Sequence, residues 1–426
     1  MIADYIRQRR WFRGKARTLA SAAIDETFPL EGAELAIVRC TYEDGGEEKY
    51  VMLRARGDAP AAHLAIGDGT FDALGSASHL ATLLAQIERG TRVAGKSGTL
   101  VLRAEAGFSG AKKDVTPKPT DKEQTNTSIV FGDSVILKVV RKLDEGRSAE
   151  LEMGEFLTKN GYASAPAVLG AIEIERGSGE PATIGIVHRL VPNQGDAWAS
   201  TLADLARASD PSAYRTRAEL LGRRVGEMHV VLARGKDASF APTRLDKAAL
   251  AKRVEADARA ASKWLDAELV EKAAQRASAF AKLDAEAIAM RVHGDLHLGQ
   301  ILVQGSDFVI IDFEGEPARS LAERKGKRSP LADVAGMVRS FDYAAATALR
   351  KSSPGAARKW SRETSRAFLA AWRDATRAAL PMDDATFQAA LDVHVLEKSL
   401  YEIAYEANNR PDWLDIPRDG LRDLLG

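Results

Sequence analysis

The chain has 426 residues, of which 45% are hydrophobic and 28% charged, a composition typical of a globular protein with a substantial core. Its 60 basic and 60 acidic residues balance, so no overall charge favours nucleic acid or an anionic membrane as a partner. A single cysteine, Cys40, excludes an internal disulfide framework, and no apolar run approaches the roughly 18 residues of a membrane span. We therefore expect a cytoplasmic protein.

Three parts with different patterns follow one another along the chain, and together they predict the α+β fold class. The predicted parts are a small N-terminal unit at 1–90, a strand-rich unit at 91–190 and a mostly helical unit at 191–426. The main predicted strands outside the motifs below are 35–41, 49–53, 99–102 and 184–191. The main predicted helices are 76–87, 147–160, 213–234, 247–264, 268–282, 329–349, 361–378 and 384–408.

A basic and aromatic run, R-R-W-F-R-G-K, opens the chain at residues 9–15. Such a run can mark a nucleic-acid patch, but no excess of basic residues continues beyond it. A buried pair of Trp11 and Phe12 between solvated cations is therefore the favoured interpretation.

A polar segment, K-E-Q-T-N-T-S at 122–128, leads into a hairpin of two short strands, 128–131 and 134–140. Its backbone N–H groups and hydroxyls are donors suited to an anion such as a phosphate. The segment lacks a glycine-rich signature, so this signal is weak by itself. The candidate anion-binding residues are Thr125, Asn126, Thr127 and Ser128.

Lys138 lies in the second strand of this hairpin, among residues that are otherwise apolar. A buried lysine is costly unless a negative charge meets it, and the next helix can supply one. Glu150 shares a face of that helix with Met153 and Leu157, so we expect it to point inward and pair with Lys138. Glu152 is the second choice.

The densest set of polar residues surrounds two short apolar strands at 301–303 and 308–311. A hairpin would bring the residues at its outer ends together. One end carries Asp295 and Gln300, and Asp312, Glu314 and Glu316 follow the other.

This arrangement has the spacing of a phosphoryl-transfer site. Protein kinases place a catalytic Asp five residues before a metal-binding Asn, and a second metal-binding Asp in a later Asp-Phe-Gly turn. Here Asp295 precedes Gln300 by five residues and Asp312 opens the sequence D-F-E. We predict that Asp295 accepts the proton of an attacking hydroxyl, and that Gln300 and Asp312 bind Mg²⁺ on the phosphates of ATP.

The kinase spacing also assigns roles by position. Lys138 would hold the α- and β-phosphates, and the backbone from His188 to Leu190 would contact adenine. His293, just before the catalytic loop, would hold that loop, a structural role. His229 lies on the predicted helix 213–234, and we expect it to pack there.

The motifs H-G-D-L-H-L-G-Q and I-D-F-E-G-E-P resemble bacterial maltokinases, which belong to the aminoglycoside-phosphotransferase branch of the protein-kinase-like fold. The opening R-W-F-R-G-K and the run E-Q-T-N-T are similar to theirs as well. The resemblance implies two lobes, one β-rich and one helical, an N-terminal cap, ATP and Mg²⁺ as cofactors, and a substrate role for Glu314. It also implies that Asp333 holds the active-site loop, as the matching Asp does in related phosphotransferases, and that the protein is a monomer that can associate with trehalose synthase.

The C-terminal segment offers aromatic and polar side chains of the kind that sugar sites use. Tyr401 and Tyr405 share one face of the last predicted helix. The competing interpretation is that these rings only pack the helix into the lobe. The candidate sugar-binding residues are Tyr401, Tyr405, Glu406, Asn409 and Trp413, together with Glu314.

The motifs place a phosphate and a metal, so they do not choose the substrate. The resemblance favours maltose, phosphorylated at its anomeric hydroxyl to give maltose 1-phosphate. The alternative is a glucosamine kinase giving glucosamine 6-phosphate, since such kinases share the cap and both motifs. A pseudokinase-like binding module is disfavoured because Lys138, Asp295, Gln300 and Asp312 are all present.

Overall fold

The computed structural model describes the chain from residue 1 to 426 except residues 106–107, 109–115, 120–124, 178, 208–213 and 350–352. Two compact units make up the chain, one of residues 1–158 and 166–192 and the other of residues 159–165 and 193–426. None of the helices described is both long and apolar enough to cross a bilayer.

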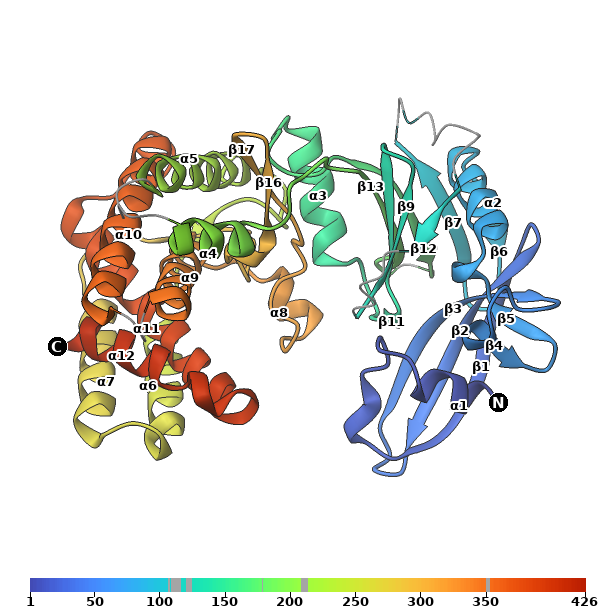
Figure 1. Cartoon of the computed structure of the whole chain (residues 1–426), viewed down its shortest axis with the longest axis horizontal. Helices are drawn as coiled ribbons and strands as arrows, with labels where there is room; N and C mark the ends of the chain where they lie inside the picture. The colour runs from blue at the N-terminus through green and yellow to red at the C-terminus, as the bar shows by residue number, and fades with distance from the viewer. Residues whose placement is uncertain (106–107, 109–115, 120–124, 178, 208–213, 350–352) are drawn as a thin grey trace. The chain divides into compact units, whose positions relative to one another are not determined.

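Within its described residues, the first unit contains two antiparallel sheets and three α-helices (Figure 1). The first sheet has the order β1-β2-β3-β5-β4, with β11 paired to β3. Its turns use glycines with positive φ, such as Gly45 between β2 and β3. The elements around this sheet are α1 (Ile2–Arg7), β1 (Leu19–Leu30), β2 (Ala33–Tyr42), β3 (Glu47–Arg56), β4 (Ala65–Gly67), β5 (Thr70–Asp72), α2 (Ala77–Glu88) and β11 (Lys142–Leu143).

The second sheet has the order β6-β7-β12-β13-β10-β9-β8 and contains the predicted hairpin. Gly132, with φ 62°, turns the chain between β9 and β10. One apolar cluster joins Phe28, Leu84 and Leu137, so both sheets and α2 share a core. The elements are β6 (Arg92–Ala94), β7 (Thr99–Ala104), β8 (Lys118–Pro119), β9 (Thr127–Phe131), β10 (Val135–Val139), α3 (Ala149–Lys159), β12 (Val168–Glu175) and β13 (Ala182–Arg189).

A buried arginine connects the two sheets. Arg141 is 3% exposed, and its guanidinium donates to Asp72 at 2.9 Å and to the Thr127 hydroxyl at 2.7 Å. The Tyr5 hydroxyl donates to the same aspartate, and Arg141 lies 4.8 Å from the centre of the Trp11 ring. The N-terminal aromatic run is therefore core, as predicted, and a charged network crosses the boundary expected near residue 90.

The second unit is mostly helical, as predicted, with two small two-stranded sheets. The helix predicted at 361–378 begins earlier, because Pro354 at its first turn suits a helix start. The helices are α4 (Ala197–Arg207), α5 (Arg215–Leu232), α6 (Lys247–Ala260), α7 (Ala267–Ala281), α8 (Leu321–Lys325), α9 (Leu331–Leu349), α10 (Pro354–Thr376), α11 (Asp384–Asn409) and α12 (Asp415–Leu425). The strands are β14 (Thr243–Arg244), β15 (Ile288–Ala289), β16 (Ile301–Gln304) and β17 (Asp307–Ile310).

Strands β16 and β17 form the predicted hairpin, with Ile301 opposite Ile310. Gly305, at φ 62°, makes the tight turn. At the other end, the Ile311 N–H donates to the Gln300 carbonyl at 2.9 Å. This bond places Gln300 beside the residue that precedes Asp312.

A buried carboxylate on α9 holds the loop before this hairpin. Asp333 is 1% exposed and accepts from the backbone N–H groups of His293 at 2.8 Å and Gly294 at 2.9 Å. The Trp372 indole N–H donates to His229 Nδ1, so His229 Nε2 carries the proton that it shares with Asp333 at 3.0 Å. Burial alone would raise the pKa of Asp333, but the hydrogen bond from His229 and the nearby histidines lower it. His229 thus packs, as predicted, and also orients the brace.

Asp333→Asn tests this brace. The substitution removes the charge that two backbone donors and His229 share, so the free energy of unfolding should fall by about 2–4 kcal/mol. Denaturant titration measures this, and Asp374→Asn on the surface of α10 is the matched control. If the contacts of Asp333 did not contribute to the free energy of unfolding, the two variants would be equally stable.

Candidate active site

Asp295 lies on the loop between β15 and β16, and its side chain is 22% exposed. The Asp295 N–H faces His293 Nδ1 at 3.3 Å, while His293 Nε2 donates to the Ile311 carbonyl at 2.9 Å. The histidine thus ties the loop to the hairpin, the structural role expected for it. Asp295 lines a pocket of about 360 Å³, whose other lining residues are Gly294, Leu296, Glu316, Arg319, Arg328, Ala332, Gly336, His394, Glu397, Lys398 and Tyr401.

Paired charges cover one wall of this pocket. Lys398 Nζ lies 3.3 Å from Asp295 Oδ1 and 3.2 Å from Glu316 Oε1. Arg319 donates to the other oxygen of Glu316. Burial alone would lower the pKa of Lys398, but the carboxylates of Asp295 and Glu316 raise it above its ordinary value. The ammonium is therefore charged at neutral pH.

A second set of charged side chains in the pocket surrounds Glu397. It is 6% exposed and contacts Arg253 at 2.9 Å, Arg328 at 3.2 Å and His394 at 3.2 Å. Burial alone would raise the pKa of Glu397, but the hydrogen bond from His394 and the two arginines lower it. This wall is an ion-pair network that fixes the position of α11.

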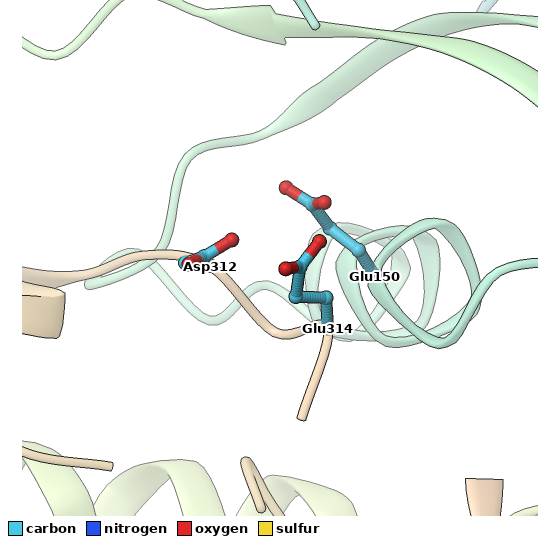
Figure 2. A group of neighbouring side chains, drawn as sticks. All are labelled: Glu150, Asp312 and Glu314. Carbon is cyan, nitrogen blue, oxygen red and sulfur yellow. The ribbon is translucent and has the colours of Figure 1, made fainter. Parts of the chain in front are cut away.

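Asp312 and Glu314 lie on the loop that follows β17 (Figure 2). Asp312 has φ 66°, a left-handed conformation that non-glycine residues rarely adopt outside functional sites. A carboxylate oxygen of Asp312 lies within 4.8 Å of one of Glu314. These two carboxylates are hard oxygen donors that suit Mg²⁺, and the backbone of Gln300 is bonded to Ile311, the residue before Asp312.

Lys138 pairs with Glu150 in the first unit, at 2.6 Å between Nζ and Oε2. Glu150, labelled on α3 in Figure 2, is therefore the partner, rather than Glu152. Burial alone would raise the pKa of Glu150, but Lys138 and His188 lower it to about 2. The lysine of β10 and the glutamate of α3 thus form the ion pair that the sequence pattern predicts.

The predicted phosphate segment lies partly outside the described residues, which resume at Thr125. Thr125 is exposed and Asn126 is buried. Thr127 opens β9 and accepts from Arg141, and Ser128 is opposite Lys138 in the strand register. The buried Arg141 thus holds this segment through the Thr127 hydroxyl.

The predicted adenine segment forms the end of β13 and the residues after it. The His188 side chain is 12% exposed, and its ring lies 3.6 Å from Glu150, the partner of Lys138. The Leu190 N–H donates to the Ser134 carbonyl at 2.8 Å, so it is not available to a nucleotide.

The aromatic residues of α11 divide between the pocket and its surroundings. Tyr401 lines the pocket, and Lys398 lies 4.8 Å from the centre of its ring. Tyr405 stacks on Tyr401, with ring centres 6.3 Å apart and planes inclined by 22°, and is 45% exposed.

The remaining predicted sugar residues have structural partners. Glu406 is 1% exposed and binds Arg410 at 2.6 Å and the Tyr343 hydroxyl at 3.1 Å, so we do not retain it as a sugar ligand. Trp413 stacks on Tyr343, with ring centres 6.2 Å apart. The amide of Asn409 donates to the Tyr405 carbonyl within the last turn of α11.

The sequence alone predicted no catalytic, metal-binding or substrate-binding role for Lys398, Glu316 or Arg319. Lys398 lies 103 residues from Asp295, so no local spacing connects them. Lys398 shares a face of α11 with Leu391 and Val395, at i−7 and i−3, and both are buried. A lysine on such an apolar face is the signal that indicates it.

Two family models match the chain. The model described as "Phosphotransferase enzyme family" matches residues 118–372, and the one described as "Maltokinase N-terminal cap domain" matches residues 5–86.

Similar proteins include two named glucosamine kinases. One, from Streptacidiphilus jiangxiensis, is 30% identical over 84% of this chain and 82% of its own. One from Mycolicibacterium smegmatis is 28% identical over 72% of this chain and 79% of its own. A solved structure titled "Glucosamine kinase in complex with glucosamine, ADP and inorganic phosphate" has a TM-score of 0.74 at 22% identity, and the match covers 99% of both chains. The extent of the first family match, joined to the 30% identity, shows that the chain belongs to the phosphotransferase enzyme family and is a sugar kinase with a maltokinase-type cap.

Proposed function

We propose that this sugar kinase transfers the γ-phosphoryl group of ATP to the 6-hydroxyl of glucosamine. The observation that carries the proposal is the 30% identity to a glucosamine kinase across 84% of the chain. Maltose, which the sequence motifs favoured, is the second candidate, and the match of the cap to a maltokinase model supports it.

The pocket around Asp295 is lined by charged groups that suit the hydroxyls of a sugar. The carboxylates of Asp295, Glu316 and Glu397 accept hydrogen bonds, and the side chains of Arg319, Arg328 and Lys398 donate them.

Asp295 is the proposed base. Its carboxylate would take the proton from the sugar hydroxyl as that oxygen bonds to the γ-phosphorus. The bond between this phosphorus and the β–γ bridging oxygen breaks, and ADP carries away the electron pair. The product is glucosamine 6-phosphate.

Asp312 and Gln300 are the proposed ligands of Mg²⁺, with Glu314 beside them. The ion, when bound, neutralises charge on the phosphates. In the first unit, Lys138 would hold the α- and β-phosphates while Glu150 fixes the direction of the lysine side chain.

Asp295→Asn should lower kcat by about 10²–10⁴-fold, because the amide cannot accept the proton. The KM for ATP should stay near its original value, since the role of Asp295 is toward the sugar. Initial-rate kinetics measure both constants, with Asp284→Asn, at an exposed position of the same unit, as control. A variant with normal kcat would remove Asp295 from the mechanism.

Asp312→Asn should abolish turnover, while Gln300→Ala should mainly raise the Mg²⁺ concentration needed for half-maximal rate. A carboxylate binds a dication more strongly than a neutral amide. Asparagine tolerates the left-handed backbone at this position, so the first variant isolates the charge. Magnesium titrations of the rate test both, with Gln304→Ala, exposed at the far end of β16, as control. If neither changed the metal dependence, the metal site would lie elsewhere.

The substrate is tested by kcat/KM for glucosamine, maltose and glucose at fixed Mg-ATP. We expect glucosamine to give the highest value, and the product to be the 6-phosphate by NMR. A clear preference for maltose would overturn the glucosamine assignment and leave the proposed catalytic residues unaffected.

A further inference from the structure

We propose that Lys398 is a positioning residue for phosphoryl transfer, which holds the Asp295 carboxylate in the orientation that receives the sugar proton. The proposal rests on the function proposed above and adds a residue from α11 to it.

The geometry is a row of alternating charges within the second unit. The row runs from Arg319 to Glu316, then to Lys398, and ends at Asp295. Lys398 Nζ is nearly equidistant from the two carboxylates, at 3.2 Å from Glu316 and 3.3 Å from Asp295. Because Arg319 already neutralises Glu316, the ammonium is not drawn away from Asp295.

The environment keeps this lysine charged and in place. Its side chain is 19% exposed and that of Glu316 only 5%. Burial alone would raise the pKa of Glu316, but Lys398 and Arg319 lower it, so the row is ionised at neutral pH. The ring of Tyr401, 4.8 Å from Nζ, adds an aromatic contact to the ammonium.

The contact leaves Asp295 able to act. Lys398 binds Oδ1, which leaves Oδ2 to take the proton of the incoming hydroxyl. A carboxylate that turns freely spends part of its time misaligned, and a displacement of about 1 Å in a reacting group can cost 10²-fold in rate. An ionic partner fixed to a long helix removes that freedom.

This role explains Glu316 and Arg319 as well. Both follow the D-F-E turn, yet neither belongs to the proposed metal site. Arg319 binds Glu316, and Glu316 binds the ammonium of Lys398 on α11. The segment after Asp312 therefore helps to hold Lys398 beside Asp295, the proposed base.

Lys398→Met keeps much of the length of the side chain and removes its charge. We expect kcat to fall about 10–100-fold, part of the effect of the base itself, with the KM values for glucosamine and ATP each within about threefold of wild type. Lys398→Arg should recover part of kcat. The control is Lys359→Met, an exposed lysine of α10 that should retain full activity. A raised sugar KM with unchanged kcat would make Lys398 a sugar ligand and overturn the proposal.

The decisive measurement is Lys398→Met in an Asp295→Asn background. If Lys398 acts through Asp295, the second substitution should lower kcat no further. Additive losses would overturn the proposal and show an independent role. Lys398→Gln, which remains polar, repeats the measurement if the methionine variant unfolds. Wild-type enzyme inactive on every sugar would instead refute the proposed function, so the two failures are distinguishable.

Discussion

The hydrogen bonds accepted by Asp333 are the constraint on which the catalytic loop depends. One buried carboxylate holds the backbone of His293 and Gly294, so the position of Asp295 is set by helix α9 rather than by the loop. The loop also approaches that helix closely, because a Cβ on Gly336 would lie only 2.4 Å from the Leu296 carbonyl oxygen. Rigid placement of a base by backbone contacts is a requirement of catalysis by proximity.

Helix α11 forms the charged wall of the pocket, and buried ion pairs determine its position. Glu397 binds two arginines, and Glu402 binds Arg339, which is 1% exposed. Breaking such a pair leaves an uncompensated buried charge, so the register of this helix is strongly specified. This wall of the pocket is thus built by electrostatics as much as by apolar packing.

The sequence predicted the local features of the site well. The hairpin after Asp295 follows from two apolar runs and a turn, and Glu150 follows from the face that it shares with Met153. Contacts between distant segments left no comparable periodic signal. Lys398 and Asp295 meet only because α9 and α11 pack, and Glu406 could be recognised as structural only once Arg410 and Tyr343 were seen beside it. Strand β1 was missed because its run of alanines and polar residues alternates weakly.

The Arg141 network has a consequence for the modularity of the protein. Its guanidinium is buried against Asp72 of the N-terminal sheet, against Trp11 between α1 and β1, and against Thr127 of the other sheet. Removing residues 1–90 would leave this cation without its carboxylate, a loss of about 3–5 kcal/mol. The cap is therefore not a detachable accessory, and homologues could exchange their caps only together with the strands that carry the matching arginine.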